Sequence, residues 1–457
     1  MNRKQRRLAA KQNRASERKL SLSDAIILGV NLHQSGQIEE AEKIYRQVLQ
    51  VKPGHPDALH YLGVISHQKG EKDEAVELIQ KAISCNPAYS DAHNNLGNVL
   101  KEIGRLDEAE EAYRYCLSVD PEYVDALCNL GAVLKEKGKY VEALKMLERA
   151  ITLAPNHSQA YHNLGNALKK LNRYAEAIIA YRKSITLLHP NDSKSYITSV
   201  YKSLSRALYI DRNYKEVADV LKQWLEFDPE NAAALHMLSA CTGENIPARA
   251  SDAFVEETFD NFAGSFDEIL KKLDYQAPEL VLSAVQAQIV DTDRQLVILD
   301  AGCGTGLCGP LLRDYASQLD GVDLSQGMVD KARDRDIYDD LVVAELTDYI
   351  ANNSNTYDLI ASADTLCYFG DLSSVLRAIF SALTEQGLLV FTVEKIIETE
   401  PAEAFRLNPH GRYSHTEEYV ISTLNQSGLQ LLSITTEHLR KEAGKSVTGM
   451  LVTAKKL

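Results

Sequence analysis

The sequence lacks long apolar runs. Its 457 residues are 45% hydrophobic and 25% charged, and no apolar stretch approaches the ~18–20 residues that a helix needs to span a bilayer. The N-terminus also lacks the apolar core of a secretory signal. We therefore expect a cytoplasmic protein with no membrane partner.

Metal-site patterns are missing as well. The seven cysteines form no CxxC pair, and no His spacing near them suits a zinc site. An odd number of cysteines without a secretory signal is typical of reduced thiols. No metal is expected.

The chain has fewer basic than acidic residues. The chain has 50 Lys and Arg against 64 Asp and Glu, a net charge of -14. Because nonspecific nucleic-acid binding depends on clustered Lys and Arg, nucleic acid is not expected as a partner. Residues 1–20 are the exception, and we expect them to form a basic, solvated and disordered arm.

The first half of the chain has a repeat of 34 residues. Proline recurs at this interval at positions 53, 87, 121 and 155. A Leu-Gly pair keeps the same interval, at 28–29, 62–63, 96–97, 130–131 and 164–165. Proline ends a helix, and glycine lets two helices approach closely. Helices of about a dozen residues are marginal alone, so the repeats must stack into an all-α rod.

The segments AHNNLGNVLKEIGRLDEAEEAYRYCLSVDP and YHNLGNALKKLNRYAEAIIAYRKSITLLHP resemble tetratricopeptide repeats. The resemblance implies about six repeats over residues 21–231, followed by a capping helix and linker over 232–253. It also implies a concave groove that binds a protein or an extended peptide.

One polar position recurs in three successive repeats, as Asn95, Asn129 and Asn163. It resembles the asparagine ladder in the repeats of O-linked N-acetylglucosamine transferases. A side-chain amide both donates and accepts hydrogen bonds, so such a ladder can pair with a peptide backbone of any sequence. These three residues are the expected peptide-binding residues. The alternative is that they simply face water.

After residue 253 the repeat gives way to apolar runs that alternate with helical stretches, such as 296–299, 319–322, 357–361 and 388–393. Alternating strands and helices predict a Rossmann-like α/β domain over 254–457. We expect a mostly parallel, seven-stranded sheet that ends in an antiparallel hairpin.

Glycines and acidic residues follow the first two of these strands. Residues 300–309 read DAGCGTGLCG, and Asp323 ends the next strand. Glycines in such a turn let a ligand contact the backbone, and an acid at the second strand's tip can accept from both ribose hydroxyls. The glycine spacing at 304, 306 and 309 also occurs in dinucleotide dehydrogenases. Asp300, however, would face a pyrophosphate unfavourably and suits an ammonium group.

The run VILDAGCGTG followed by GVDLSQGM resembles motif I and the acidic loop of class I S-adenosylmethionine-dependent methyltransferases. The chain looks similar to bacterial predicted methyltransferases that carry tetratricopeptide repeats. The resemblance implies S-adenosyl-L-methionine as the cofactor, with the methionine part at the glycine turn, the ribose at Asp323 and the adenine at Met328. The family commonly has Asp where Glu345 stands. The implied cofactor-binding residues are Asp300, Gly302, Gly304, Gly306, Asp323, Leu324, Met328, Glu345 and Leu346.

Polar residues after the later strands are candidates for the acceptor site, where an acceptor atom must lie within ~3–3.5 Å of the methyl carbon. His415 could serve as a general base, although a structural role in its loop is the alternative. Arginine forks could grip an acidic acceptor. The expected catalytic residues are Asp364, Tyr413 and His415. The expected substrate-binding residues are Tyr368, Arg412 and Arg440.

Three functions fit these features. The first is an enzyme that methylates a protein or peptide captured by the repeats. The second is an enzyme that methylates a small acidic molecule. The alternative to both is a repeat scaffold whose methyltransferase domain binds the cofactor but is catalytically inactive, because fold and motif establish a cofactor site better than they establish activity.

Overall fold

The computed structural model describes residues 21–260, 262–289, 295–397, 404–442 and 444–457. The expected basic arm, residues 1–20, lies outside these ranges. The chain forms two compact units that divide between Asp211 and Arg212. The division comes before residue 231, where the repeat region was expected to end.

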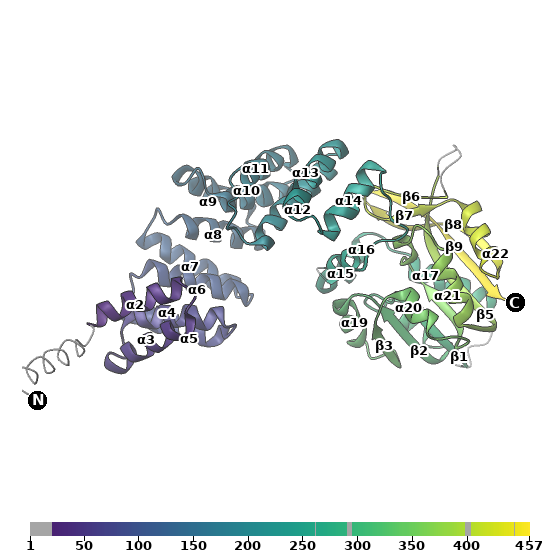
Figure 1. Ribbon diagram of the computed structural model, residues 1–457, viewed down its shortest axis with the longest axis horizontal. Coiled ribbons are helices and arrows are strands. Elements are labelled where there is room, and N and C mark those ends of the chain that lie inside the picture. Colours follow the sequence, from purple (N-terminus) through teal and green to yellow (C-terminus); the bar gives the residue numbers. More distant parts are fainter. Residues whose placement is uncertain (1–20, 261, 290–294, 398–403, 443) are drawn as a thin grey trace, which may run out of the picture. The chain divides into compact units, whose positions relative to one another are not determined.

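The first unit consists of helices that pack in successive pairs (Figure 1). Its helices are α2 (Leu22–Gln34), α3 (Ile38–Val51), α4 (Pro56–Gln68), α5 (Lys72–Cys85), α6 (Ser90–Glu102), α7 (Leu106–Val119), α8 (Val124–Glu136), α9 (Tyr140–Leu153), α10 (Ser158–Lys170), α11 (Tyr174–Thr186) and α12 (Lys194–Ile210). The expected solenoid of helix pairs is confirmed.

The Leu-Gly pair of each repeat is explained by the packing inside a helix pair. A Cβ atom on Gly97 of α6 would lie 2.6 Å from Cε1 of Tyr113 in α7. On Gly131 of α8, a Cβ atom would lie 2.6 Å from Cγ of Leu147 in α9. Only glycine allows this approach, so the repeated glycine sets how closely the two helices pack.

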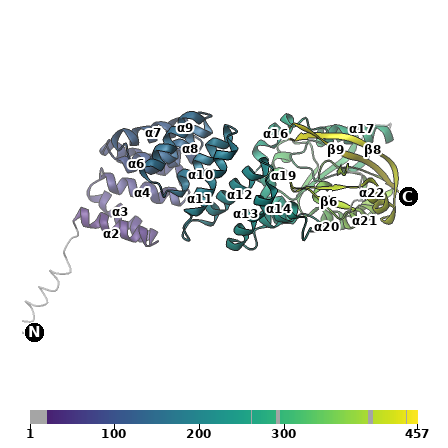
Figure 2. The same cartoon turned by 90° about the horizontal axis from the view of Figure 1, so that it is seen from above.

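The second unit begins with helices α13 and α14 and continues into an α/β domain (Figure 2). Its helices are α13 (Tyr214–Phe227), α14 (Ala232–Thr242), α15 (Asp252–Asp260), α16 (Phe266–Lys272), α17 (Ala277–Gln288), α18 (Gly309–Leu312), α19 (Gln326–Arg333), α20 (Leu346–Ala351), α21 (Ser373–Ala382) and α22 (Glu417–Gln426), with short 3-10 helices at Ala263–Ser265 and Leu366–Tyr368.

The sheet has nine strands in the described part of the chain, so the expected number of seven is wrong. The strands are β1 (Leu296–Ala301), β2 (Ala316–Asp323), β3 (Asp340–Val343), β4 (Tyr357–Ser362), β5 (Leu383–Lys395), β6 (Phe405–Leu407), β7 (Tyr413–His415), β8 (Leu429–Glu442) and β9 (Lys445–Lys456). The two additional strands, β6 and β7, have only three residues each and no apolar run that could reveal them in the sequence.

Strand order explains where a ligand site can form. The main path is β3-β2-β1-β4-β5-β7-β6, with β9 paired to β5 and β8 paired to β9. Pairs along this path are parallel except β6 with β7, and the β9 pairs are antiparallel. From β1 the chain first builds the sheet outward through β2 to β3, and then returns to the other side of β1 to add β4 and β5. The strand order therefore reverses at β1. In such sheets a crevice opens at the carboxyl ends of these strands.

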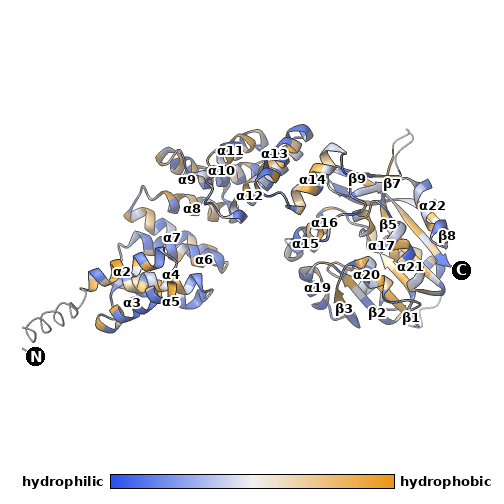
Figure 3. Cartoon of the chain, viewed as in Figure 1, coloured by the Kyte–Doolittle hydropathy of each residue, from blue (hydrophilic) through white to orange (hydrophobic). Residues whose placement is uncertain are grey.

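Alternate residues of the central strands pack on opposite faces of the sheet. Ile298 and Leu359 pack with α17 and α18 residues, whereas Leu299 and Ile360 pack with residues of α20, α21 and α22. Both faces are therefore covered, as expected for a mainly parallel sheet, and apolar residues concentrate in its strands (Figure 3). None of the described helices combines the length and apolarity that crossing a membrane requires.

Candidate active site

A cavity of about 290 Å³ opens at the carboxyl ends of β1, β2 and β4, close to the lower end of the ~300–1,000 Å³ range of small-ligand sites. Helices α15 and α16 contribute Phe259 and Phe266 to its wall. The expected cofactor-binding residues that line it are Asp300, Gly302, Gly304, Asp323, Leu324, Met328, Glu345 and Leu346. Gly306 is not among the lining residues.

The glycine turn after β1 brings backbone to the cavity. Gly302 has a φ of 78°, and a Cβ atom there would lie 2.3 Å from Oγ1 of Thr365. Its N–H donates to the carbonyl of Val322 over 2.8 Å. Gly306 has a φ of 82°, and its N–H donates to the carbonyl of Cys303. Gly306 therefore closes the turn, while Gly302 and Gly304 face the cavity.

Asp300 is buried, with 1% of its surface exposed. The hydroxyl of Tyr338 donates to its Oδ2 over 2.6 Å. Burial raises the pKa of Asp300 to about 7, although the Tyr338 hydrogen bond opposes the shift. A cation beside the carboxylate would lower this pKa and stabilise the ionised form. No sequence pattern indicated Tyr338, which follows α19.

Asp323 stands at the end of β2 with both oxygens held by backbone groups. The N–H of Gly304 donates to Oδ2 and the N–H of Ser325 donates to Oδ1, each over 2.9 Å. Burial raises the pKa of Asp323, and these hydrogen bonds oppose the rise. An ionised carboxylate has about four acceptor positions, so both oxygens can still accept hydrogen bonds from ligand hydroxyls.

The expected adenine end of the cavity is apolar on one side and acidic on the other. Met328 and Leu346 are buried in the wall. Glu345 caps α20, accepting from the N–H of Asp348 over 2.8 Å. Its Oε1 lies 3.9 Å from Nη2 of Arg249. The Glu345 side chain therefore already has a structural role at this end.

Two carboxylates attach the leading helices to segments at either end of α19. Asp260, at the end of α15, accepts from Oγ of Ser325 over 2.5 Å and from the N–H of Gly327 over 3.1 Å. Asp267 in α16 accepts from Nη2 of Arg335 over 2.5 Å. Neither is recognisable from the sequence, because acidic residues at helix termini are common on protein surfaces. They hold α15 and α16 beside the cavity.

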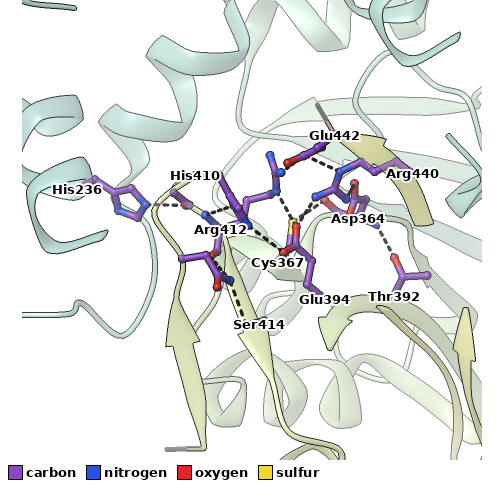
Figure 4. A network of polar contacts seen from close by, with 12 residues as sticks. His236, Asp364, Cys367, Thr392, Glu394, His410, Arg412, Ser414, Arg440 and Glu442 are labelled. Atoms are coloured by element: carbon purple, nitrogen blue, oxygen red, sulfur yellow. Dashed lines mark hydrogen bonds and ion pairs between the residues drawn. The ribbon is translucent and has the colours of Figure 1, made fainter. Parts of the chain in front are cut away.

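The side of the cavity expected to receive the acceptor carries a partly buried ion cluster (Figure 4). We call it the acceptor-side cluster, and its members are Asp364, Glu394, Arg412, Arg440 and Glu442. Nη1 of Arg440 lies 2.5 Å from Oδ2 of Asp364, and its Nε lies 2.9 Å from Oε1 of Glu442. Nε of Arg412 lies 2.8 Å from Oε1 of Glu394. Three carboxylates therefore already compensate the two guanidinium groups, so Arg412 and Arg440 are not free to grip an acid as expected from the sequence.

Asp364 is the member with unused hydrogen-bonding capacity. Its Oδ1 is buried and has no hydrogen-bond partner in the described parts of the chain, although buried polar atoms are nearly always paired. Its backbone is held at a φ of 57° and its N–H donates to Oγ1 of Thr392. A left-handed conformation in a non-glycine residue is strained and is often found at functional sites. Asp364 lines the cavity.

Two expected catalytic residues do not line the cavity. The hydroxyl of Tyr413 donates to the carbonyl of Pro247 over 2.8 Å. His415 is fully buried, and its Nε2–H donates to the carbonyl of Gly370 over 3.0 Å. Burial lowers its pKa to about 4. The expected catalytic roles do not fit this geometry, because both side chains support the packing around β7.

The expected substrate-binding residues Tyr368, Arg412 and Arg440 all line the cavity. The ring of Tyr368 lies 5.4 Å from that of Phe259 in an edge-to-face arrangement, and Phe259 in turn lies 6.0 Å from Phe266. The three aromatic rings form an apolar part of the cavity wall, which we call the aromatic wall.

Comparison with protein families identifies both parts of the chain. Residues 299–391 match the methyltransferase domain. Residues 32–99, 90–123 and 122–188 match tetratricopeptide repeat models.

Several named methyltransferases are similar in sequence to the α/β domain. A malonyl-[acyl-carrier protein] O-methyltransferase from Acetivibrio thermocellus is 33% identical over 105 residues, which are 22% of this chain and 37% of that protein. An 18S rRNA (guanine-N(7))-methyltransferase from Bos taurus is 32% identical over 22% of this chain and 38% of its own. A ubiquinone biosynthesis O-methyltransferase from Xanthomonas euvesicatoria pv. vesicatoria is 26% identical over 41% of this chain and 85% of its own. The chain thus spans less than half the length of the first two.

Among solved structures, pilF of Pseudomonas aeruginosa is 22% identical with a TM-score of 0.42, covering 48% of this chain and 96% of that one. The matched families, taken with the helix pairs and the glycine turn of the α/β domain, show that the chain joins tetratricopeptide repeats to a methyltransferase domain.

Proposed function

We propose that the chain is an S-adenosyl-L-methionine-dependent methyltransferase. The observation that carries this proposal is that one cavity is lined by Asp300, Asp323 and the backbone of Gly302 and Gly304. The buried Asp300 and the partly buried Asp323 suit a ligand with an ammonium group and ribose hydroxyls, and they disfavour the pyrophosphate of a dinucleotide.

The residues present fit this cofactor. When bound, S-adenosyl-L-methionine supplies a methyl group activated by its sulfonium. Asp300 would hold the ammonium group and Asp323 the ribose hydroxyls, while Met328 and Leu346 would cover the adenine. Because burial raises the pKa of Asp300 to about 7, a cation beside it would favour the ionised form, so the residue suits a positively charged ligand.

The acceptor lies, on this proposal, beside the acceptor-side cluster. Because its arginines are already paired with carboxylates, an acceptor with a neutral O–H or N–H group is better supported than a small acidic molecule. Oδ1 of Asp364 would accept the hydrogen bond of that group and orient it. It would also receive the proton of that group as the acceptor atom bonds to the methyl carbon and the bond from this carbon to the sulfonium sulfur breaks. The aromatic wall would exclude water from the same space.

Calorimetry with S-adenosyl-L-methionine tests the cofactor proposal. Asp323→Ala removes hydrogen bonds to an ionised group, which are worth about 1.5–3 kcal/mol each. We expect it to weaken binding by about a hundredfold or more. Glu385→Ala is a matched control, because Glu385 is exposed and does not line the cavity. Wild-type protein that gives no binding signal would rule out both enzyme and cofactor-binding scaffold.

A methyl-label transfer screen on lysate tests activity and acceptor. Transfer to a protein band would support delivery of a peptide by the repeats, and transfer to a small molecule would support a metabolite acceptor. Cofactor binding without any transfer would favour the scaffold alternative.

A truncated chain tests delivery by the repeats. The fragment 212–457 keeps the complete second unit, including α14, whose His236 contacts the cavity loop at Gly411. If it methylates the acceptor as well as the full chain does, the repeats do not deliver the acceptor.

A further inference from the structure

Lysine recurs at one position in three successive repeats of the first unit. Lys101, Lys135 and Lys169 lie in the last turns of α6, α8 and α10, separated by the repeat interval. Helix α8 contacts both α6 and α10, so the three lysines follow one another across neighbouring helices. We call these residues, with Lys170 and Arg206, the basic row.

Most of the basic row has no acidic partner. Neither Lys101, Lys169, Lys170 nor Arg206 forms an ion pair with any described residue, and Lys135 is 4.0 Å from Glu136. Other lysines of the same repeats are paired: Nζ of Lys137 and Nζ of Lys139 lie 2.6 and 3.0 Å from Oε2 of Glu110. The last turns of these first helices therefore carry a run of cations with little acidic compensation, although single lysines without an ion pair to any described residue, such as Lys145 and Lys183, also occur on the second helices.

The positive charges of the basic row also lie close enough to repel one another. Burial and the positive charges of Arg206, Lys170 and Lys135 lower the pKa of Lys169 to about 8. Burial likewise lowers the pKa of Lys135, as do the charges of Lys101 and Lys170. Repulsion among like charges opposes folding of this face, and an anion bound there would relieve it.

The asparagine positions lie on the same helices, about a turn and a half before the lysines. Asn129 and Lys135 of α8 are joined by Ala132 in steps of three residues, which form a ridge along a helix. Nδ2 of Asn129 donates to Oδ1 of Asn98 over 3.0 Å, and Nδ2 of Asn163 reaches the carbonyl of Cys128 over 3.5 Å. The amide oxygens of both asparagines have no partner in the described residues. They remain free to accept hydrogen bonds.

We propose that the face formed by α6, α8 and α10 binds an extended acidic segment of a partner protein. Its Asp and Glu side chains would pair with Lys101, Lys135 and Lys169, and its backbone N–H groups would donate to Asn129 and Asn163. This inference rests on the proposed peptide-binding role of the repeats and adds the chemistry of the peptide. A nucleic-acid backbone offers anions but no N–H donors for the amide oxygens, and the chain's net charge of -14 opposes it.

Fluorescence anisotropy with the full chain tests the proposal. The probe is a labelled Glu/Ser peptide of about a dozen residues, spanning ~40 Å when extended, and the comparison peptide has Gln in place of Glu. We expect the acidic peptide to bind about tenfold or more tightly, with affinity that falls as salt rises. The double variant Lys135→Glu/Lys169→Glu should abolish the preference.

Lys145→Glu/Lys183→Glu is the matched control, because both lysines are exposed on the second helices α9 and α11. Lys135→Gln/Lys169→Gln, checked by circular dichroism, separates loss of charge from loss of folding. Equal affinity for the two peptides, or an equal effect of the control pair, would overturn the proposal. Tighter binding of a single-stranded RNA would assign the face to nucleic acid instead.

Cofactor calorimetry on the same preparation keeps this test separate from the enzyme proposal. Protein that binds S-adenosyl-L-methionine but shows no preference for acidic peptide contradicts only the inference about the repeats. Protein that prefers the acidic peptide but does not bind S-adenosyl-L-methionine contradicts only the proposed enzymatic function.

Discussion

At the level of single residues, the buried carboxyl of Asp300 destabilises the ligand-free protein when it is ionised. Its pKa rises from 3.8 to about 7 on folding, so the folded state holds a proton that the unfolded state has released. The contribution of Asp300 to the free energy of unfolding therefore falls as pH rises from the unfolded pKa towards about 7. We expect Asp300→Asn to stabilise the ligand-free chain at pH 8 by about 1–4 kcal/mol, at about 1.4 kcal/mol per pKa unit. Urea unfolding at pH 8 and pH 5 measures this.

The same pKa predicts how cofactor binding depends on pH. An ammonium group favours ionised Asp300, so binding releases a proton below about pH 7. Affinity for S-adenosyl-L-methionine should rise as pH increases to about 7 and then level off. Calorimetry in buffers of different ionisation enthalpy would detect the proton. A flat profile, or an Asn variant that keeps the wild-type pH dependence, would contradict the role given to Asp300.

The unpaired Oδ1 of Asp364 leads us to expect an effect on the rate of methyl transfer. Asp364→Asn preserves shape but weakens the base, so we expect the rate of methyl transfer to fall by about 10²–10⁴. Affinity for the cofactor should change little, because Asp300 and Asp323 hold the cofactor on this proposal. Label transfer to the acceptor found in the screen measures the rate. Glu442→Gln is the comparison within the same cluster, and an equal loss there would indicate a structural role for Asp364.

At the scale of the element, α14 is more than the cap and linker expected over residues 232–253. Nε2–H of His236 donates to the carbonyl of Gly411 over 2.8 Å, and its ring stacks on Phe254 at 4.0 Å. Gly411 lies between Arg412, a member of the acceptor-side cluster, and His410, whose Nε2 lies 3.4 Å from Oε2 of Glu394 in that cluster (Figure 4). The helix therefore supports the loop that carries Arg412.

His236 is thus a positioning residue. His236→Ala should lower kcat for methyl transfer more than it weakens cofactor binding, because it releases the loop and leaves Asp323 untouched. His236→Gln can still donate to Gly411 and should restore part of the rate. His189→Ala, an exposed change in the first unit, serves as control. Unchanged kcat in His236→Ala would show that the loop is held without this contact.

The elements also show what the sequence could predict and what it could not. Asp300, the glycine turn and Asp323 were predictable because each lies within a few residues of a strand end, where local pattern and position coincide. The acceptor-side cluster joins side chains from β5, β8 and two loops, and no local pattern reveals such pairing. The sequence left both a catalytic and a structural role open for His415, because its partner Gly370 is distant in the sequence.

At the scale of the whole molecule, the chain divides into two compact units, and every residue proposed to hold the cofactor belongs to the second. A ligand stabilises only the part that binds it, by about 2.7 kcal/mol at a hundred times its Kd. We expect S-adenosyl-L-methionine to raise the unfolding temperature of the second unit and leave that of the repeats unchanged. Calorimetric scanning of the full chain and of the 212–457 fragment would assign the two transitions. Asp323→Ala should remove the shift, and a ligand-induced shift of both transitions would show that the units unfold together.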